Sequence, residues 1–120
     1  MGNSSPVLFA TGLGIFGEIR ASYDDRNKEN EAAIIKRLST VPMLILDDAG
    51  KYKTENEEFM QRIYFTIIDG RYSSKLPIVI TSNLKPSELL KYIGEASFDR
   101  LLEVADFIQL LGESYRGKKG

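Results

Sequence analysis

Two neighbouring carboxylates, Asp47 and Asp48, follow directly on the apolar run of residues 43–46. A Mg²⁺–nucleotide site needs such an acidic strand end: one carboxylate holds the water shell of the metal, and the other orients or deprotonates the attacking water. Neighbouring residues at a strand end point in different directions, so the two roles can be divided. Asp47 is therefore a candidate metal ligand and Asp48 a candidate catalytic residue, although the same pair could simply end a strand and start a turn.

A polar amide, Asn83, stands in a similar place, just after the apolar run of residues 77–80. Its side chain could bond a water molecule or a phosphate oxygen between the sheet and a nucleotide. The alternative is an Asx-type turn that leads into Pro86. Polar groups that follow covered strands gather at one edge of a parallel sheet, which favours a site shared by Asn83 and Asp47.

Three single arginines are the remaining candidates. Arg100 and Arg116 are suited to contacting phosphate, either within the chain or from a neighbouring subunit. Each could instead form a surface ion pair. Arg71 could be a cation that favours the C-terminus of a helix.

The glycine-rich stretch ATGLGIFGEI fits two nucleotide-binding patterns. Gly12 and Gly17 match the frame of a phosphate loop, G-x-x-x-x-G-K-[ST], but Glu18 and Ile19 stand where that loop needs Lys and Ser or Thr. A carboxylate at the Lys position would repel a triphosphate, so we predict that this is no phosphate loop. The dinucleotide pattern needs an acid-tipped strand about 20 residues later, where this sequence has a polar loop and a helix. We interpret Gly12 as easing a strand-to-helix turn, and Gly14 and Gly17 as permitting close packing of the helix on the sheet.

Hydrophobic periodicity places these residues on alternating strands and helices. Apolar runs without alternation predict strands that are covered on both faces. One helix should begin with a capping box of Thr54 and Glu57 and end at Gly70. The expected strands are residues 7–11, 43–46, 77–80 and 106–111; the expected helices are residues 13–23, a helix around 34–38 that stops before Pro42, and residues 54–69, 86–92 and 98–105. This order predicts a three-layer α/β domain whose ligands bind beyond the carboxyl ends of parallel strands.

Composition limits the possible chemistry. With 16 basic and 17 acidic residues, the net charge of −1 gives no global attraction to nucleic acid or to an anionic membrane. The chain has no Cys and no His, which excludes disulfides, thiolate metal sites and histidine-based catalytic triads. No apolar run reaches the roughly 18 residues of a membrane span, and no signal peptide is evident, so we expect a cytoplasmic protein without a membrane partner.

The length of 120 residues indicates one domain. We expect residues 1–6 to be a leader added for expression, residues 7–116 to form the domain, and residues 117–120 to be a disordered tail.

Five segments in chain order, LILDDAG, IIDGRY, LPIVITSNL, FDRLLE and GESYR, together resemble the AAA+ ATPase domain of bacterial DnaC/DnaI-type replicative helicase loaders. The related IstB-type transposition helpers are close behind. The resemblance covers nearly the whole chain, from Val7 to Arg116, and the ordered set is far more specific than any one motif.

By matching positions, the resemblance implies a role for each candidate. Asp47 resembles the Mg²⁺-side acid of the Walker B motif, and Asp48 stands in its catalytic-acid slot. Asn83 is similar to the sensor 1 residue. Arg100 resembles the arginine finger offered to the nucleotide of the adjacent subunit, and Arg116 resembles the sensor 2 arginine.

The resemblance also implies a P-loop NTPase type of α/β fold that is truncated and missing its first strand. In the family, that strand and its phosphate loop precede the strand that residues 7–11 resemble, so they would lie upstream of Met1. In the sheet, the family places the strand between the sensor 1 strand and the last strand. We therefore expect this chain alone not to hydrolyse ATP, and we expect the gap to favour pairing between chains or a rearranged sheet.

The implied function is that of the C-terminal part of an AAA+ ATPase that acts in DNA replication as a helicase loader. ATP and Mg²⁺ would be its cofactors, and the replicative helicase, single-stranded DNA and further copies of itself would be its partners. The alternatives are an IstB-type transposition helper ATPase and a non-catalytic α/β interaction module in which the motif residues are relics. An NAD-type dehydrogenase is the weakest rival.

Overall fold

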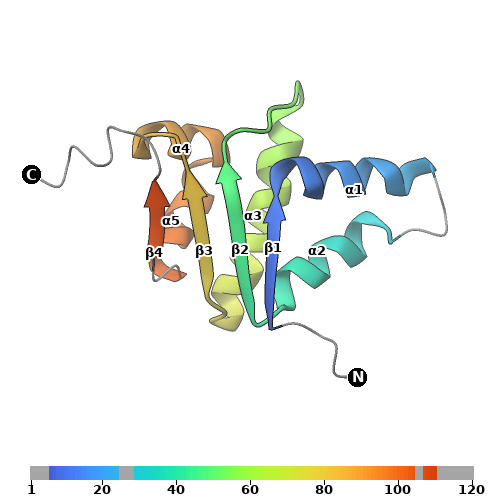
Figure 1. Ribbon diagram of the computed structural model, residues 1–120, viewed down its shortest axis with the longest axis horizontal. Helices are drawn as coiled ribbons and strands as arrows, with labels where there is room; N and C mark the ends of the chain where they lie inside the picture. The colour runs from blue at the N-terminus through green and yellow to red at the C-terminus, as the bar shows by residue number, and fades with distance from the viewer. Residues whose placement is uncertain (1–5, 25–28, 105–106, 111–120) are drawn as a thin grey trace, which may run out of the picture.

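Four parallel strands follow one another across the sheet in chain order, and helices connect each strand to the next (Figure 1). The computed structural model describes residues 6–24, 29–104 and 107–110. The predicted order of strands and helices is confirmed over these residues. The elements are β1 (Val7–Thr11), α1 (Gly12–Asp24), α2 (Glu31–Thr40), β2 (Met43–Ala49), α3 (Glu57–Ser74), β3 (Ile78–Ser82), α4 (Pro86–Ile93), α5 (Glu95–Val104) and β4 (Phe107–Leu110).

The helices pack against one face of the sheet. Figure 1 shows α3 and α5 behind the strands, and the side chains of Leu44, Leu46, Ile78 and Ile80 are buried with the helices in a single core. Crossovers between parallel strands are right-handed, so strands that follow one another in chain order receive all their connecting helices on the same side. The α/β class with a parallel sheet is confirmed, and the described residues make up two of the three expected layers.

Within the described residues, no helix covers the opposite face of the sheet. Phe9, Ile45 and Val79 form a row across three paired strands on this face, and Phe9 is 70% exposed. An apolar run predicts that a strand will be covered without saying by what. Because Phe9 is exposed on this face, the prediction that both faces of the sheet are covered is not confirmed for the described residues.

β3 and β4 are neighbours in the sheet, at the place where the resemblance implies a further strand between them. β3 pairs directly with β4, with Val79 opposite Phe107 and Ile80 opposite Ile108. The described residues therefore form one continuous four-stranded sheet.

Helix α3 differs from its predicted limits at both ends. Its N-cap is Asn56, whose side chain accepts a hydrogen bond of 3.0 Å from the backbone N–H of Phe59. Thr54 instead accepts from the backbone N–H of Asn56, so the predicted capping box of Thr54 with Glu57 is wrong. The helix also continues through Gly70, where a Cβ would lie 3.2 Å from Ser39. Gly70 therefore permits close packing of α3 on α2 rather than ending the helix.

Arg71 lies in the last turn of α3, as expected of a cation at a helix C-terminus, and its side chain is fully buried. Its guanidinium donates hydrogen bonds to the carbonyl oxygens of Leu38, Pro42 and Pro77 at 2.9, 3.3 and 2.7 Å. Burial lowers the pKa of Arg71 to about 10, so the side chain still carries its charge at neutral pH. It ties the end of α2 to the turns that enter β2 and β3.

In the described part of the chain, no helix has the length and apolar character needed to cross a membrane.

Candidate functional site

The acidic strand end is built on a β-bulge. β2 continues past its predicted end to Ala49, and its pairing with β3 shifts after Leu46, so that Asp47 and Asp48 together oppose Thr81. Asp48 has a left-handed backbone conformation, with φ 59°, which few residues other than glycine adopt. A bulge changes the direction of side chains at a strand end, so the two acids need not point the same way.

Asp47 and Asp48 line different hollows. Asp47 borders a hollow of about 240 Å³ that Thr11 and Glu18 also line. Asp48 borders a hollow of about 390 Å³ at the start of α1, which Thr11 and Lys51 also line. The divergence that the sequence suggested for neighbouring acids is therefore present in the structure, and it would allow them separate roles.

One hydroxyl group contacts both acidic residues. Thr81 Oγ1 donates a hydrogen bond of 2.7 Å to Asp47 Oδ1 and accepts one of 2.8 Å from the backbone N–H of Asp48. The carboxylate of Asp48 also lies 3.6 Å from Lys51 Nζ. The sequence places Thr81 at the same strand end as Asn83, but it does not predict the contacts of Thr81, because the residue that faces the acids depends on the bulge. The available signal was a hydroxyl residue at the end of the neighbouring strand.

A second set of contacts fixes the turn after the acids. Gly50 has φ 100°, and a Cβ at this position would overlap the side chain of Leu84. Ser82 Oγ donates to the carbonyl oxygen of Ala49 and accepts a hydrogen bond of 3.0 Å from the backbone N–H of Leu84. The segments that follow β2 and β3 are therefore locked to each other.

Asn83 lies at the same edge of the sheet as the acids. It directly follows Ser82, which pairs with Ala49 at the end of β2, and its side chain is exposed. The structure therefore brings three of the predicted residues, Asp47, Asp48 and Asn83, to the carboxyl ends of neighbouring strands.

The structure does not bring Arg100 to the acids. Arg100 lies on α5, where its Nε donates a hydrogen bond of 2.9 Å to Asp69 Oδ1 and its guanidinium stacks 4.9 Å from the ring centre of Tyr72. The hydrogen bond with Asp69 raises the pKa of Arg100. Asp69 and Tyr72 belong to the C-terminal part of α3, which leads to the start of β3, opposite the edge that carries the acids. Arg116 lies outside the described residues.

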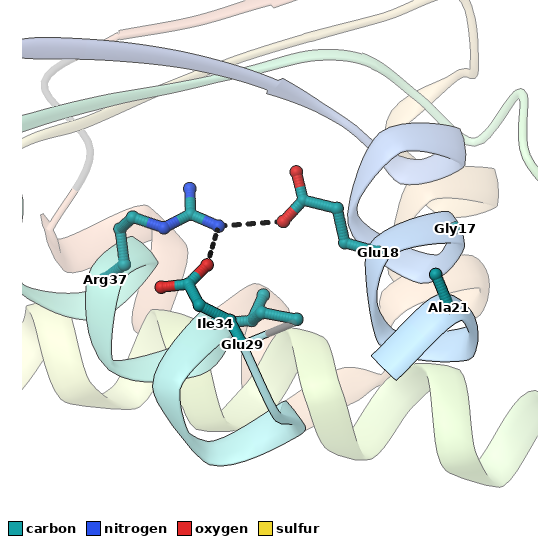
Figure 2. A pocket seen from close by; sticks show the side chains of 6 residues that line it. All are labelled: Gly17, Glu18, Ala21, Glu29, Ile34 and Arg37. Carbon is teal, nitrogen blue, oxygen red and sulfur yellow. Dashed lines mark hydrogen bonds and ion pairs between the residues drawn. The ribbon is translucent and has the colours of Figure 1, made fainter. Parts of the chain in front are cut away.

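The glycine-rich stretch forms no phosphate cradle. Glu18, at the position that a phosphate loop gives to lysine, pairs with Arg37 of α2 at 2.8 Å. Arg37 also pairs with Glu29 at 2.9 Å. Figure 2 shows the guanidinium of Arg37 held between the two carboxylates, in a hollow of about 570 Å³ that Gly17 also lines. Arg37, the cation beside Glu18, is already paired with two carboxylates. This part of α1 therefore offers no net positive charge to a phosphate.

The roles expected for the three glycines are partly corrected. A Cβ at Gly12 would lie 3.0 Å from Tyr52 Cβ and from Tyr64 Oη, so Gly12 permits close packing. The backbone N–H of Gly14 donates a hydrogen bond of 3.0 Å to Thr11 Oγ1. A Cβ at Gly17 would meet nothing within 4 Å, so the prediction of close packing at Gly17 is wrong, because α1 borders an open hollow there.

The donor chemistry of the acidic edge fits a hydrated Mg²⁺ ion. The described residues contain no group of three or more His, Cys, Asp or Glu side chains that could enclose a metal. Mg²⁺ does not need one, because it usually keeps several waters and binds one or two carboxylates together with the phosphates of its substrate. The exposed carboxylate of Asp47 matches that requirement.

The sequence is similar to a known protein family and to several known proteins. Residues 5–120 match the family described as IstB-like ATP binding proteins. The chain is 29% identical over 117 residues to the replicative helicase loader DnaC of Buchnera aphidicola, a match that covers 97% of this chain and 47% of that protein.

Two further relatives are matched over a smaller share of the chain. The chain is 29% identical over 111 residues to the replicative helicase loader DnaI of Bacillus subtilis, covering 82% of this chain and 34% of that protein. It is 32% identical over 90 residues to the insertion sequence IS21 putative ATP-binding protein of Pseudomonas aeruginosa, covering 71% of this chain and 33% of that protein. The chain therefore spans less than half the length of these relatives.

Proposed function

The chain belongs to the family of IstB-like ATP binding proteins, and from this premise we propose that it carries the Walker B and sensor 1 part of an AAA+ ATP-hydrolysing site. The observation that carries the proposal is the diverging pair Asp47 and Asp48 at the carboxyl end of β2, beside Asn83 at the end of β3. Ligands of parallel α/β sheets bind at this edge.

Each residue has a proposed role. Asp47 holds the water shell of Mg²⁺, which supplies positive charge against the phosphates when MgATP is bound. Asp48 orients and deprotonates the attacking water, and Asn83 donates a hydrogen bond to that water or to a phosphate oxygen. Arg100 and Arg116 are proposed to contact phosphate as the arginine finger and the sensor 2 residue.

Arg100 is better placed to contact a nucleotide bound by a second subunit than a nucleotide bound at the acids of its own chain. It lies on α5, tied to Asp69 and Tyr72 of α3, away from the strand ends that carry the acids. A side chain that is 39% exposed remains available to a neighbouring molecule. This position supports the proposal of self-association with a shared site.

We further propose that the protein is a helicase loader, with the replicative helicase and single-stranded DNA as partners. Relatives named as replicative helicase loaders match up to 97% of the chain. The transposition helper is the second candidate. It is supported by the family description and by the IS21 relative, which shows 32% identity over 71% of the chain.

The ATPase proposal can be tested in a chimera in which residues 7–116 replace the matching segment of the Buchnera relative. The phosphate-loop consensus is absent from the 120 residues, and we propose that the chain alone does not turn over ATP. The chimera should hydrolyse ATP, and Asp48→Ala should abolish turnover. Asp99→Asn, an exposed acid on α5, should leave turnover unchanged. Turnover that is indifferent to Asp48→Ala would favour the interaction module with relic motifs.

The partner is tested separately. Purified replicative helicase should retain the chimera in a pull-down with MgATP, whereas an IS21-type transposase should not. Retention by the transposase alone would select the transposition helper.

A further inference from the structure

The bulge at the acidic strand end is in contact with a side chain of the next strand. Two residues of β2 oppose Thr81 of β3, and the extra residue of a bulge is left without a partner in the ladder. The backbone N–H of Asp48 would be such an orphan, and Thr81 Oγ1 accepts its hydrogen bond at 2.8 Å. The hydroxyl therefore replaces the missing ladder contact.

The same hydroxyl determines where the Asp47 carboxylate lies. Thr81 uses its one proton to donate to Asp47 Oδ1 at 2.7 Å, and among the described residues no other side chain bonds to this carboxylate. A hydroxyl has one donor and two acceptor positions, so it can serve Asp47 and Asp48 at once. Valine, which has nearly the same shape, could serve neither.

We propose that Thr81 is a positioning residue of the acidic pair: it fixes the Asp47 carboxylate for a divalent cation and holds Asp48 in its left-handed backbone conformation. This inference rests on the proposed metal-side role of Asp47. Thr81 itself touches neither metal nor substrate in this assignment. It acts through the two acids, as hydrogen-bonded partners of ligating carboxylates do in metal sites.

The test uses the 120-residue chain and Mn²⁺ alone as the probe. In residue-resolved amide NMR spectra, bound Mn²⁺ broadens the signals near its site, which reports weak binding at a known place. The variants are Thr81→Val, which removes the hydroxyl, Thr81→Ser, which restores it, and Asp47→Asn. Thr66→Val is the matched control, because the hydroxyl of Thr66 bonds only to the carbonyl oxygen of Arg62 within an exposed turn of α3.

We expect Mn²⁺ to broaden the amide signals of Asp47 and Asp48 in the wild-type chain, and Asp47→Asn to abolish this effect. In Thr81→Val the titration midpoint should rise about tenfold or more, the usual effect of losing such a partner. Thr81→Ser should recover most of the affinity, and Thr66→Val should match the wild type. A role in general stability would not separate Ser from Val at position 81 in this way.

The hydrogen bond to Asp48 is followed independently through exchange of its amide proton. Exchange should be faster in Thr81→Val than in Thr81→Ser. Thr81→Ala replaces the valine variant if that variant does not fold.

Two other outcomes would overturn the inference, and they differ in what else they remove. Unchanged Mn²⁺ titration in the hydroxyl-free variant, with binding still lost in Asp47→Asn, would exclude the positioning role of Thr81 and leave the proposed role of Asp47 intact. No broadening near Asp47 in the wild-type chain would show that Asp47 holds no cation without a nucleotide, and it would overturn the inference, while the chimera would still test the proposed ATPase.

Discussion

The guanidinium of Arg71 donates a hydrogen bond of 2.7 Å to the carbonyl oxygen of Pro77, at the entrance to β3. The same side chain bonds to the carbonyls of Leu38 and Pro42, so one cation joins three chain segments at the amino ends of the strands. Carbonyl oxygens stabilise this buried cation, and within the described residues no acid is among its hydrogen-bond partners.

Arg71→Met should lower the free energy of unfolding by about 3 kcal/mol, because three carbonyl oxygens in buried or partly buried contacts lose a charged donor. Arg71→Lys should also destabilise the protein, because a single ammonium group lacks the fork that reaches three acceptors. Urea denaturation measures both losses. Arg62→Lys, at an exposed pair with Glu31, is the control and should change stability by less than about 0.5 kcal/mol. A Met variant as stable as the wild type would contradict the role given to Arg71.

Gly50→Ala should destabilise the turn after the acids by at least about 2 kcal/mol, because it combines a left-handed backbone with overlap against Leu84. In a Leu84→Ala background the overlap is gone, and the cost should fall to the backbone contribution of about 1–2 kcal/mol. Gly17→Ala is the matched control. It lies in α1 with nothing within 4 Å of its Cβ position and should stabilise the protein by roughly 1 kcal/mol. Equal costs of Gly50→Ala in both backgrounds would exclude the overlap.

The contribution of two buried phenols to stability should fall as pH rises above 10. Burial raises the pKa of Tyr64 well above its ordinary value of 10.0, and burial also raises the pKa of Tyr92, whose hydroxyl lies 3.4 Å from that of Tyr64. Below pH 10 both phenols are neutral in the folded and unfolded chains. Above it the unfolded chain loses protons first, so the unfolded state gains stability relative to the folded one.

Thermal melts between pH 8 and 11 would measure this fall. Tyr64→Phe should make the decrease shallower, because a buried ionisable phenol is gone. A Tyr64→Phe variant with the wild-type slope would mean that burial of this phenol does not govern alkaline unfolding.

Self-association should involve the open face of the sheet. Phe9 is 70% exposed in the row with Ile45 and Val79, and covering this row would remove apolar surface from water. Phe9→Glu should therefore reduce association in light scattering at high concentration. Tyr23→Glu places the same charge at a 64% exposed site on α1 and should have a smaller effect. A strictly monomeric wild type would contradict the expectation of self-association.

The site was only partly predictable from local patterns. Asp47, Asp48 and Asn83 could be placed at one edge of the sheet because parallel strands end together. The contacts of Thr81 could not be predicted, since they follow from a bulge that shifts the pairing of β2 with β3. The resemblance assigned a role to Arg100 but did not predict its partners Asp69 and Tyr72, because these contacts depend on how α5 packs on α3.

By itself, the sequence determined the order of strands and helices, because apolar periodicity and helix-ending residues act over a few neighbouring positions. It also determined that Glu18 could not serve as the lysine of a phosphate loop, since charge is a property of the residue type. Only the tertiary structure decided that Arg71 is buried, that α3 runs through Gly70, and that the helices share one face of the sheet. These features depend on contacts between segments distant in the chain, where burial and strand pairing outweigh the local preferences that a sequence pattern records.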